Sequence, residues 1–279
     1  MPRKPAHVKE LPVVREFLKI SQDIWLKGWA ERNAGNASIR LAEGEIRGFI
    51  DTKAAVRSQR ISTAVPELAG DYYLITGTGK YFRNIKESPE ENIGVIRIDE
   101  SGAGYRILWG LEGDGLPTSE LSAHLLTHLT QRRAGREGLR VLLHTHPTNL
   151  IALSFVLELD TKVFTRRLWE MNSECIIFFP DGVGVLPWGV PGSEEIGRDT
   201  ARLMERHRLV LWPFHGIWGA GSTLDETFGM IDTAEKAAEV LVKVLSMGGA
   251  RQAISDSQLL ELCRQFRVTP MEGVLTSGE

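Results

Sequence analysis

The sequence predicts a single α/β sandwich rather than a doubly wound parallel sheet. Short apolar runs end at turns rich in Gly and Pro, and two of them, 93–99 and 104–110, have the spacing of a β-hairpin. Segments with the apolar periodicity of helices lie at 11–32, 117–135 and 223–249. Hairpins of antiparallel strands mixed with helices are typical of one sandwich that surrounds a common core.

The first helix is predicted over 11–32. Its apolar stripe consists of Leu11, Val14, Leu18 and Trp25, with Phe17 and Ile24 beside it. We expect the tetrapeptide 33–36 ("NAGN") to stop this helix, because Gly and Asn adopt left-handed backbone angles most readily. Strands are expected at 37–41 and 71–76, and the polar, poorly periodic segment 42–70 between them is expected to be a variable surface excursion.

The helix at 117–135 begins with Pro117, which precedes a Thr/Ser cap and places Glu120 in the first turn. A strand at 140–146 and a helix at 147–159 follow it. The remaining predicted elements are apolar strands at 175–180, 183–188 and 209–221, and helices at 223–249 and 255–266.

Composition narrows the class of protein. Of 279 residues, 42% are hydrophobic and 25% are charged, and the net charge of −3 gives no general attraction to nucleic acid or to an anionic membrane. Two cysteines are too few for a disulfide framework, no apolar run is long enough to span a bilayer, and no secretory signal is evident. We therefore expect a cytoplasmic chain of one domain, 1–279, that binds neither nucleic acid nor membrane.

The most informative motif is the pair of histidines at the end of the strand 140–146. Residues i and i+2 of a strand point to the same face, so His144 and His146 can present two imidazoles to one metal ion. His215 ends another apolar run and precedes Gly216, which would allow a tight turn and a third ligand. Three neutral imidazoles with an open coordination position suit a divalent transition metal, zinc first.

Other interpretations of the histidines remain open. The pair could simply be strand-end histidines bonded to backbone carbonyl groups, and His215 could be a turn residue. Glu120, His124 and His128 are spaced by four residues and form a rival set on one helix face. Because that face also packs the helix, its histidines could instead be buried and hydrogen-bonded.

Three turns are rich in hydrogen-bond donors of the kind that bind phosphate. Thr76–Lys80 ("TGTGK") follows a strand but lacks the spacing of a P-loop, and Asn33–Asn36 places two amides around a glycine. Thr118 and Ser119 place two hydroxyls at a helix N-terminus. Each turn also has an ordinary structural explanation as a cap or a helix stop, and the sequence does not show whether the three converge.

Taken in order, several blocks resemble the class II aldolase/adducin family. The resemblance extends from about Phe17 to the C-terminus, and 42–70 is its least recognisable part. The blocks are "WLKGWAERNAGN", "LITGTGKYFRN", "PTSELSAHLLTH", "HTHPTNLIAL", "FPDGVGVLPWGVPG", "LVLWPFHGIWG" and "TLDETFGMIDTAEKAAEVLVKVLSMGG". The resemblance implies a three-layer α/β/α sandwich around a mainly antiparallel sheet, commonly assembled as a homotetramer with four-fold symmetry.

The resemblance also implies a function and a set of site residues. It implies an enzyme with one Zn²⁺ per subunit that reversibly cleaves L-rhamnulose 1-phosphate to dihydroxyacetone phosphate and L-lactaldehyde through a metal-stabilised enediolate. His144, His146 and His215 match the metal ligands, and Glu120 and Glu174 match the catalytic carboxylates. The positions that match phosphate-binding residues are Asn33, Gly35, Asn36, Thr78, Gly79, Thr118 and Ser119.

The sequence departs from the family pattern in small ways. Thr78 stands where serine is expected, and Ala34 stands within a loop of the Asn-Gly-Gly-Asn type. These changes affect the expected rate and affinity more than the class of reaction. The alternatives are a family member that cleaves L-fuculose 1-phosphate or epimerises a pentulose phosphate at C4, a non-catalytic adducin-like binding module, and a purely structural zinc site.

Overall fold

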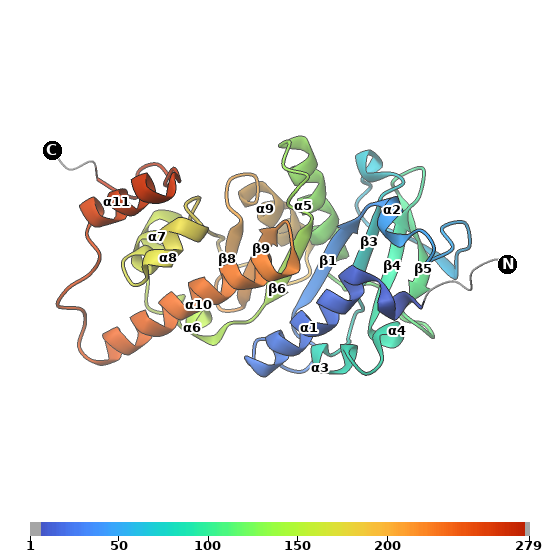
Figure 1. Ribbon diagram of the computed structural model, residues 1–279, viewed down its shortest axis with the longest axis horizontal. Helices are drawn as coiled ribbons and strands as arrows, with labels where there is room; N and C mark the ends of the chain where they lie inside the picture. The colour runs from blue at the N-terminus through green and yellow to red at the C-terminus, as the bar shows by residue number, and fades with distance from the viewer. Residues whose placement is uncertain (1–6, 277–279) are drawn as a thin grey trace.

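The computed structural model describes residues 7–276, which form a central mixed sheet flanked by helices on both faces (Figure 1). The sheet has nine strands in the order β2-β5-β4-β3-β1-β6-β9-β8-β7. The strands are β1 (Asn36–Leu41), β2 (Arg57–Arg60), β3 (Tyr72–Thr76), β4 (Ile93–Ile98), β5 (Gly104–Gly110), β6 (Val141–Thr145), β7 (Val183–Val185), β8 (Leu209–Trp212) and β9 (Gly216–Gly221). Among the strands of residues 7–276 only the β7–β8 pair is parallel, which confirms the mainly antiparallel sheet.

The helices fall into long packing helices and short connecting ones. The longer helices are α1 (Pro12–Leu26), α5 (Leu121–Arg133), α7 (Thr161–Trp169), α9 (Glu194–Leu203), α10 (Leu224–Ser246) and α11 (Asp256–Phe266). The shorter ones are α2 (Glu43–Ile46), α3 (Phe82–Ile85), α4 (Pro89–Asn92), α6 (Thr148–Leu153), α8 (Ser173–Phe178) and the 3₁₀ turns η1 (Val8–Glu10) and η2 (Pro66–Leu68). None of the helices within residues 7–276 has the length and apolar character needed to cross a membrane.

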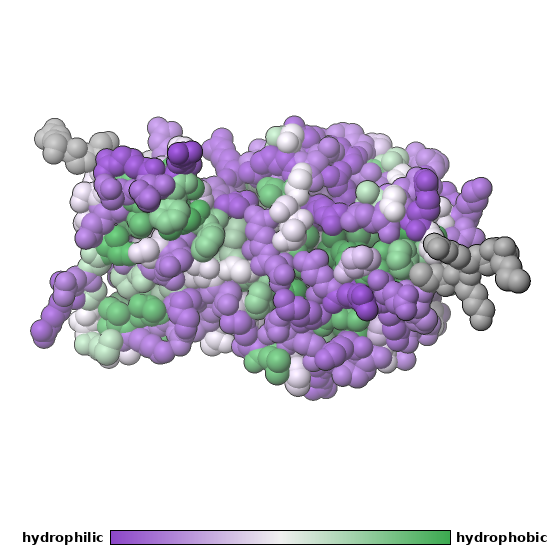
Figure 2. Space-filling model, in the orientation of Figure 1, coloured by the Kyte–Doolittle hydropathy of each residue, from purple (hydrophilic) through white to green (hydrophobic). Residues whose placement is uncertain are grey.

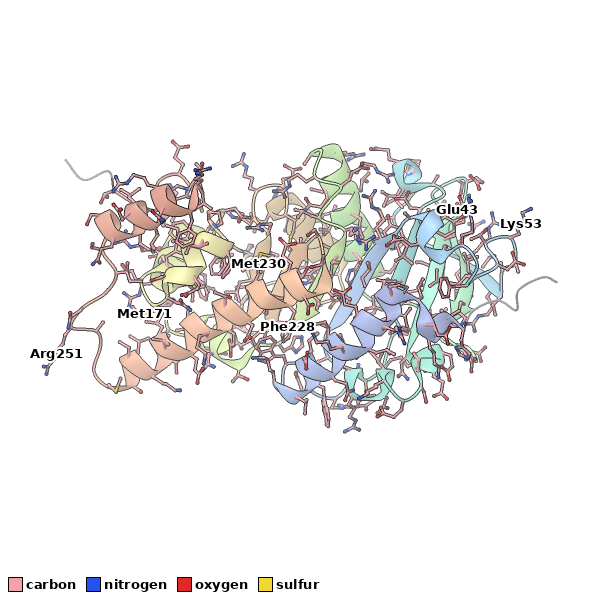
Figure 3. The ribbon with its side chains drawn as sticks, viewed as in Figure 1. Glu43, Lys53, Met171, Phe228, Met230 and Arg251 are labelled. Atoms are coloured by element: carbon pink, nitrogen blue, oxygen red, sulfur yellow. The ribbon has the colours of Figure 1, made fainter. Side chains whose placement is uncertain are left out.

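Alternation along the strands divides the core into two apolar layers, one on each face of the sheet. Leu74 belongs to the cluster that packs under α1 and α10, whereas its neighbours Tyr73 and Ile75 pack under α5. Val210 and Trp218 extend the second layer beneath α5 and α9. This arrangement is the predicted α/β/α sandwich, and Figure 1 shows α1 and α10 together on the face toward the viewer. Phe228 of α10, labelled in Figure 3 where that helix passes α1, contacts Trp29 with ring centroids 5.6 Å apart.

The first helix is shorter than predicted, and one residue expected on its buried face is exposed. The α1 helix ends at Leu26, and Gly28, at φ 74°, turns the chain five residues before "NAGN". Trp25 was expected on the buried stripe, but its side chain is 42% exposed, whereas Phe17 and Ile24 are fully buried. Leu11 and Val14 of the predicted stripe are buried and Leu18 packs against the core, so the prediction was wrong at Trp25, which lies in the last turn of the helix.

The segment 175–180 was predicted as a strand and is instead the helix α8. Asn172 caps this helix by accepting a hydrogen bond from the Glu174 backbone N–H. The prediction failed because an apolar run this short has no periodicity that separates strand from helix. In a second correction, Glu120 is itself the N-cap residue of α5, so the expected Thr/Ser cap was placed one or two residues too early.

Other boundaries also differ. The helix predicted at 147–159 ends at Leu153, the run 209–221 folds back on itself as the hairpin β8–β9, and α7 and α9 were not predicted. The excursion 42–70 is mostly exposed, but it supplies the edge strand β2 and the buried side chains of Val65 and Leu68. Figure 2 shows that the face toward the viewer is largely hydrophilic, with hydrophobic patches between the helices.

Candidate active site

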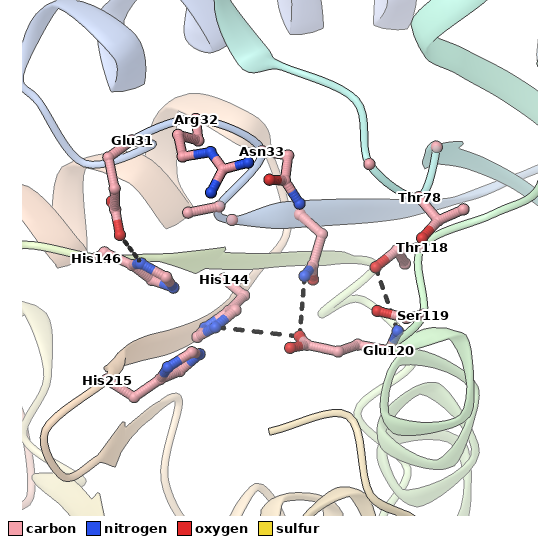
Figure 4. A pocket seen from close by; sticks show the side chains of 15 residues that line it. Glu31, Arg32, Asn33, Thr78, Thr118, Ser119, Glu120, His144, His146 and His215 are labelled. Carbon is pink, nitrogen blue, oxygen red and sulfur yellow. Dashed lines mark hydrogen bonds and ion pairs between the residues drawn. The ribbon is translucent and has the colours of Figure 1, made fainter. Parts of the chain in front are cut away.

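A pocket of about 340 Å³ lies at one end of the four adjacent strands β3, β1, β6 and β9 (Figure 4). These strands are neighbours in the sheet, so the segments that begin or end them meet there. The residues that line the pocket are Glu31, Arg32, Asn33, Ala34, Gly35, Asn36, Gly77, Thr78, Gly79, Thr118, Ser119, Glu120, His144, His146 and His215. Every site residue expected from the sequence is among them except Glu174.

The three histidines form a cluster in the pocket. His144 is in β6, His146 follows that strand, and His215 lies in the turn between β8 and β9. One ring nitrogen from each histidine lies within 4.8 Å of the others. Among the described residues, these three side chains form the group that could hold a metal ion. In Figure 4 the three rings face one another on one side of the pocket.

Hydrogen bonds at the far side of two rings orient them toward a common point. The Nδ1 of His144 lies 3.1 Å from the carbonyl oxygen of Ile217, and the Nδ1 of His146 lies 2.9 Å from Oε1 of Glu31. Because both acceptors require a proton on Nδ1, each Nε2 has a free lone pair. Both Nε2 atoms are buried and have no hydrogen-bond partner, which is the state expected of metal ligands.

Burial favours the neutral form of two of the three rings. Loss of hydration, with repulsion from His146 and His215, holds the pKa of His144 well below its ordinary value. Burial and the neighbouring His146 lower the pKa of His215 to about 4. Imidazole nitrogens with free lone pairs fit a divalent transition metal. The three side chains therefore suit the zinc ion that the sequence predicted.

Glycine is required at position 216, although it does not form the tight turn that the sequence analysis expected there. The left-handed residue of the turn is Phe214, at φ 64°, rather than Gly216. A Cβ on residue 216 would lie 2.5 Å from the carbonyl oxygen of Thr145 and 2.8 Å from the His146 ring. Glycine therefore permits the close approach of β9 to the end of β6 that brings His215 beside the other two histidines.

Glu120 lies between the histidine cluster and the donor-rich turns. Its Oε2 accepts a hydrogen bond from Nδ2 of Asn36 at 2.9 Å and lies 4.0 Å from Nε2 of His144. The residue is only 8% exposed, and burial raises the pKa of its carboxyl to about 7, although the Asn36 bond opposes this rise. A carboxyl with a pKa near neutrality can both accept and return a proton under physiological conditions.

The rival histidine set does not form a metal site. His124 and His128 are buried, lie outside the pocket lining, and hydrogen-bond to the hydroxyl of Ser38 at 2.8 Å each. The interpretation of these residues as buried, hydrogen-bonded histidines is therefore confirmed. Burial lowers the pKa of His124 to about 3, so both rings are neutral within the helix-sheet interface.

The three donor-rich turns do converge on the pocket. Gly35 adopts φ 77° and its α-carbon approaches the carbonyl oxygen of His144, where a Cβ would lie at 2.9 Å. The backbone N–H of Thr118 donates to the carbonyl of Thr76, which holds the start of α5 against the end of β3. Figure 4 places Thr78, Thr118 and Ser119 on the side of Glu120 away from the histidines. One side of the pocket thus carries the three potential metal ligands, and the other side is rich in neutral hydrogen-bond donors.

Two lining residues were missed by the sequence analysis. Glu31 holds the ring of His146, and Arg32, at φ 51°, is the one Lys or Arg side chain among the residues that line the pocket. Figure 4 shows both on the loop that precedes β1, with Asn33. Arg32 directly precedes "NAGN", and this position could have identified it as a pocket residue from the sequence. No spacing pattern relates Glu31 to a histidine 115 residues away.

Glu174 is not brought to this pocket within one chain. It is an exposed residue in the first turn of α8 and is not part of the pocket lining. The sequence resemblance alone supports its catalytic role.

Comparison with known proteins finds similar sequences over nearly the whole chain. Residues 15–242 match the family described as class II aldolase and adducin N-terminal domain. The chain is 54% identical, over 94% of its length and 96% of the relative's, to a rhamnulose-1-phosphate aldolase of Escherichia coli O139:H28. It is 53% identical, with the same coverage, to the protein of that name from Shigella sonnei.

Solved structures show the same fold. A sugar-phosphate aldolase from Thermotoga maritima is 32% identical, with a TM-score of 0.74 over 85% of this chain and 97% of the other. An L-fuculose 1-phosphate aldolase gives a TM-score of 0.58 over 91% of this chain and 96% of the other, at 20% identity.

Proposed function

We propose, from the premise that this chain belongs to the class II aldolase and adducin family, that it reversibly cleaves L-rhamnulose 1-phosphate to dihydroxyacetone phosphate and L-lactaldehyde. The observation that carries the proposal is the pocket itself. Glu120, with its raised pKa, lies between a cluster of three histidines and a group of neutral hydrogen-bond donors. The identity of 54% over nearly the whole chain supports this substrate over the other ketose phosphates of the family.

We propose that the metal is Zn²⁺, one ion per subunit, held by His144, His146 and His215. The support is the all-nitrogen donor set with its buried, unpartnered Nε2 atoms. A divalent cation bound there supplies Lewis-acid polarisation of the ketone oxygen and the adjacent hydroxyl of the substrate.

In the proposed mechanism, Glu120 moves the proton. During condensation its carboxylate removes a proton from the hydroxymethyl carbon of dihydroxyacetone phosphate, and during cleavage it returns that proton. Burial favours the protonated carboxyl, and the hydrogen bond from Asn36 favours the carboxylate, so the two effects hold the proton affinity near neutrality. No lysine Schiff base is involved.

We propose that the phosphate group binds Asn33, Gly35, Asn36, Thr78, Gly79, Thr118 and Ser119. Backbone N–H groups and hydroxyls at these turns supply the donors, and Arg32 adds a positive charge on the same pocket. Phosphate bound remote from the breaking bond orients the reacting carbons, so these contacts lower the barrier through positioning.

We further propose that the enzyme is a cytoplasmic homotetramer in which the chain forms one domain with a variable segment at 42–70. Exposed apolar side chains such as Phe155, Phe178 and Trp188, at 69%, 50% and 65%, support burial between subunits. Both cysteines are free, which is compatible with a reducing compartment. A tetramer also gives a route for the proposed catalytic role of Glu174, because that role requires Glu174 to reach the pocket of a neighbouring subunit.

The experiment is a coupled assay of the metal-loaded protein with L-rhamnulose 1-phosphate, L-fuculose 1-phosphate and L-ribulose 5-phosphate. We expect turnover of the first at a rate well above the other two, and loss of most turnover with retention of zinc in Glu120→Ala. No turnover of the first substrate would overturn the proposal. Turnover of the second or third alone would identify another activity of the family, and none at all would indicate a binding module.

A further inference from the structure

A chain of buried polar side chains runs from Glu120 into the space between β1 and α5. The Oδ1 of Asn36 lies 2.6 Å from Nε2 of His124, and Nδ1 of His124 lies 2.8 Å from Oγ of Ser38. The same Oγ lies 2.8 Å from Nε2 of His128. Ser38 and His124 are at most 1% exposed, and the other three residues at most 8%. These contacts join Glu120 to a histidine two helical turns away.

The chemistry of the groups fixes the direction of these hydrogen bonds. An ionised Glu120 can only accept, so the amide of Asn36 turns its Nδ2 toward it and its Oδ1 toward His124. His124 must then carry its proton on Nε2, which leaves Nδ1 to accept from the Ser38 hydroxyl. Because that hydroxyl proton is used, Nε2 of His128 must donate to Oγ of Ser38. All the bonds therefore point toward Glu120.

Packing keeps both rings in the required orientation. The ring of His124 lies 4.7 Å from the ring of Trp218, and the ring of His128 lies 4.8 Å from that of Tyr73, measured between centroids. Neutral imidazoles are also required, because a charged ring would donate from both nitrogens and break the sequence of bonds. Burial, which lowers the pKa of both rings, meets this requirement.

We propose that His128, Ser38 and His124 form a positioning network that fixes the amide of Asn36 so that its Nδ2 always faces Glu120. This inference rests on the proposed function, in which Glu120 moves the proton. Without the network, a half-turn of the Asn36 amide would present its carbonyl oxygen to the carboxylate. Repulsion between the two oxygens would displace Glu120 from the reacting carbon. The three residues touch no substrate and act only through Asn36.

The test uses Ser38→Ala, which removes the central hydroxyl, and Ser38→Thr, which keeps it. In the zinc-loaded enzyme we expect the alanine variant to lose about tenfold in kcat, as is usual for partners that orient a site, with KM and zinc content changed less than about twofold. The threonine variant should recover most of the loss. Thr127→Val is the matched control, because Thr127 is a fully buried residue of α5 whose hydroxyl has no partner in the described chain.

A second measurement does not depend on turnover. ¹⁵N NMR of histidine-labelled enzyme should show the proton on Nε2 for both His124 and His128 in the wild type at pH 8. Protons on Nδ1 of both rings would show the opposite direction of hydrogen bonding and would overturn the proposal. A kcat of Ser38→Ala equal to that of wild type would overturn it as well. If the wild type cleaves no ketose phosphate, the proposed function fails, while the tautomers still decide whether the network has the inferred direction.

Discussion

Replacing Glu120 with glutamine should stabilise the metal-free protein at pH 8 and have much less effect at pH 5. The two side chains have nearly the same shape, and glutamine can still present an oxygen to Nδ2 of Asn36. The two variants differ because the buried glutamate ionises as the pH rises, whereas glutamine stays uncharged at every pH. The substitution therefore isolates the free energy of burying this one charge.

The magnitude follows from the pKa. Burial raises the pKa of Glu120 to about 7 from its ordinary value of 4.5, so the folded state binds this proton more tightly than the unfolded state does. The resulting contribution to stability is complete below the unfolded pKa and is lost as the pH rises from 4.5 through 7. At about 1.4 kcal/mol per pKa unit the full loss is roughly 3 kcal/mol, nearly all of it reached by pH 8.

The assay is urea unfolding of both variants with metal removed by chelator, at pH 5 and at pH 8. All other groups are the same in both proteins, so their contributions cancel when the two free energies of unfolding are subtracted. We expect the free energy of unfolding of Glu120→Gln, relative to wild type, to rise by about 2 to 3 kcal/mol between pH 5 and pH 8. A difference that stays constant within about 0.5 kcal/mol would refute the raised pKa and, with it, the role of burial in tuning this carboxyl.

Three further predictions test the surroundings of the site. Glu31→Ala should weaken zinc binding by about 10- to 100-fold in competition with a chromophoric chelator, and Glu31→Gln, which keeps an acceptor for His146, should weaken it less. Gly216→Ala should lower the bound zinc measured by elemental analysis, because its Cβ would meet the Thr145 carbonyl at 2.5 Å; equal zinc content in the variant would contradict this steric explanation. Phe17→Ala should cost about 3 to 5 kcal/mol in urea unfolding, since the ring is fully buried against α3; a cost below about 1 kcal/mol would mean that the core collapses around the gap.

Local patterns determined much of the fold. The α10 helix was predicted with its start and end, because Thr223 caps the first turn and Gly248 and Gly249 adopt positive φ just past the last turn. The hairpin of β4 and β5 was likewise predicted from alternation and a turn. These features depend on residues within a few positions of one another, so the sequence contains all the information that they need.

The sequence also determined part of the site. The spacing of His144 and His146 follows from the geometry of a strand, and the donor-rich turns were found from their composition. It did not determine that most of the segment 175–180 is helical, since an apolar run this short has no periodicity that distinguishes a helix from a strand. Nor did it show how the donor-rich turns meet.

Contacts between distant segments were decided only by the tertiary structure. The pairing of β6 with β9, in which Thr145 lies opposite Ile217, brings His215 beside two histidines about 70 residues earlier in the chain. The hydrogen bonds from His146 to Glu31 and from Asn36 to Glu120 join residues 115 and 84 positions apart. Such contacts depend on strand order and register, which are set by the packing of the whole sheet against its helices and not by any local pattern.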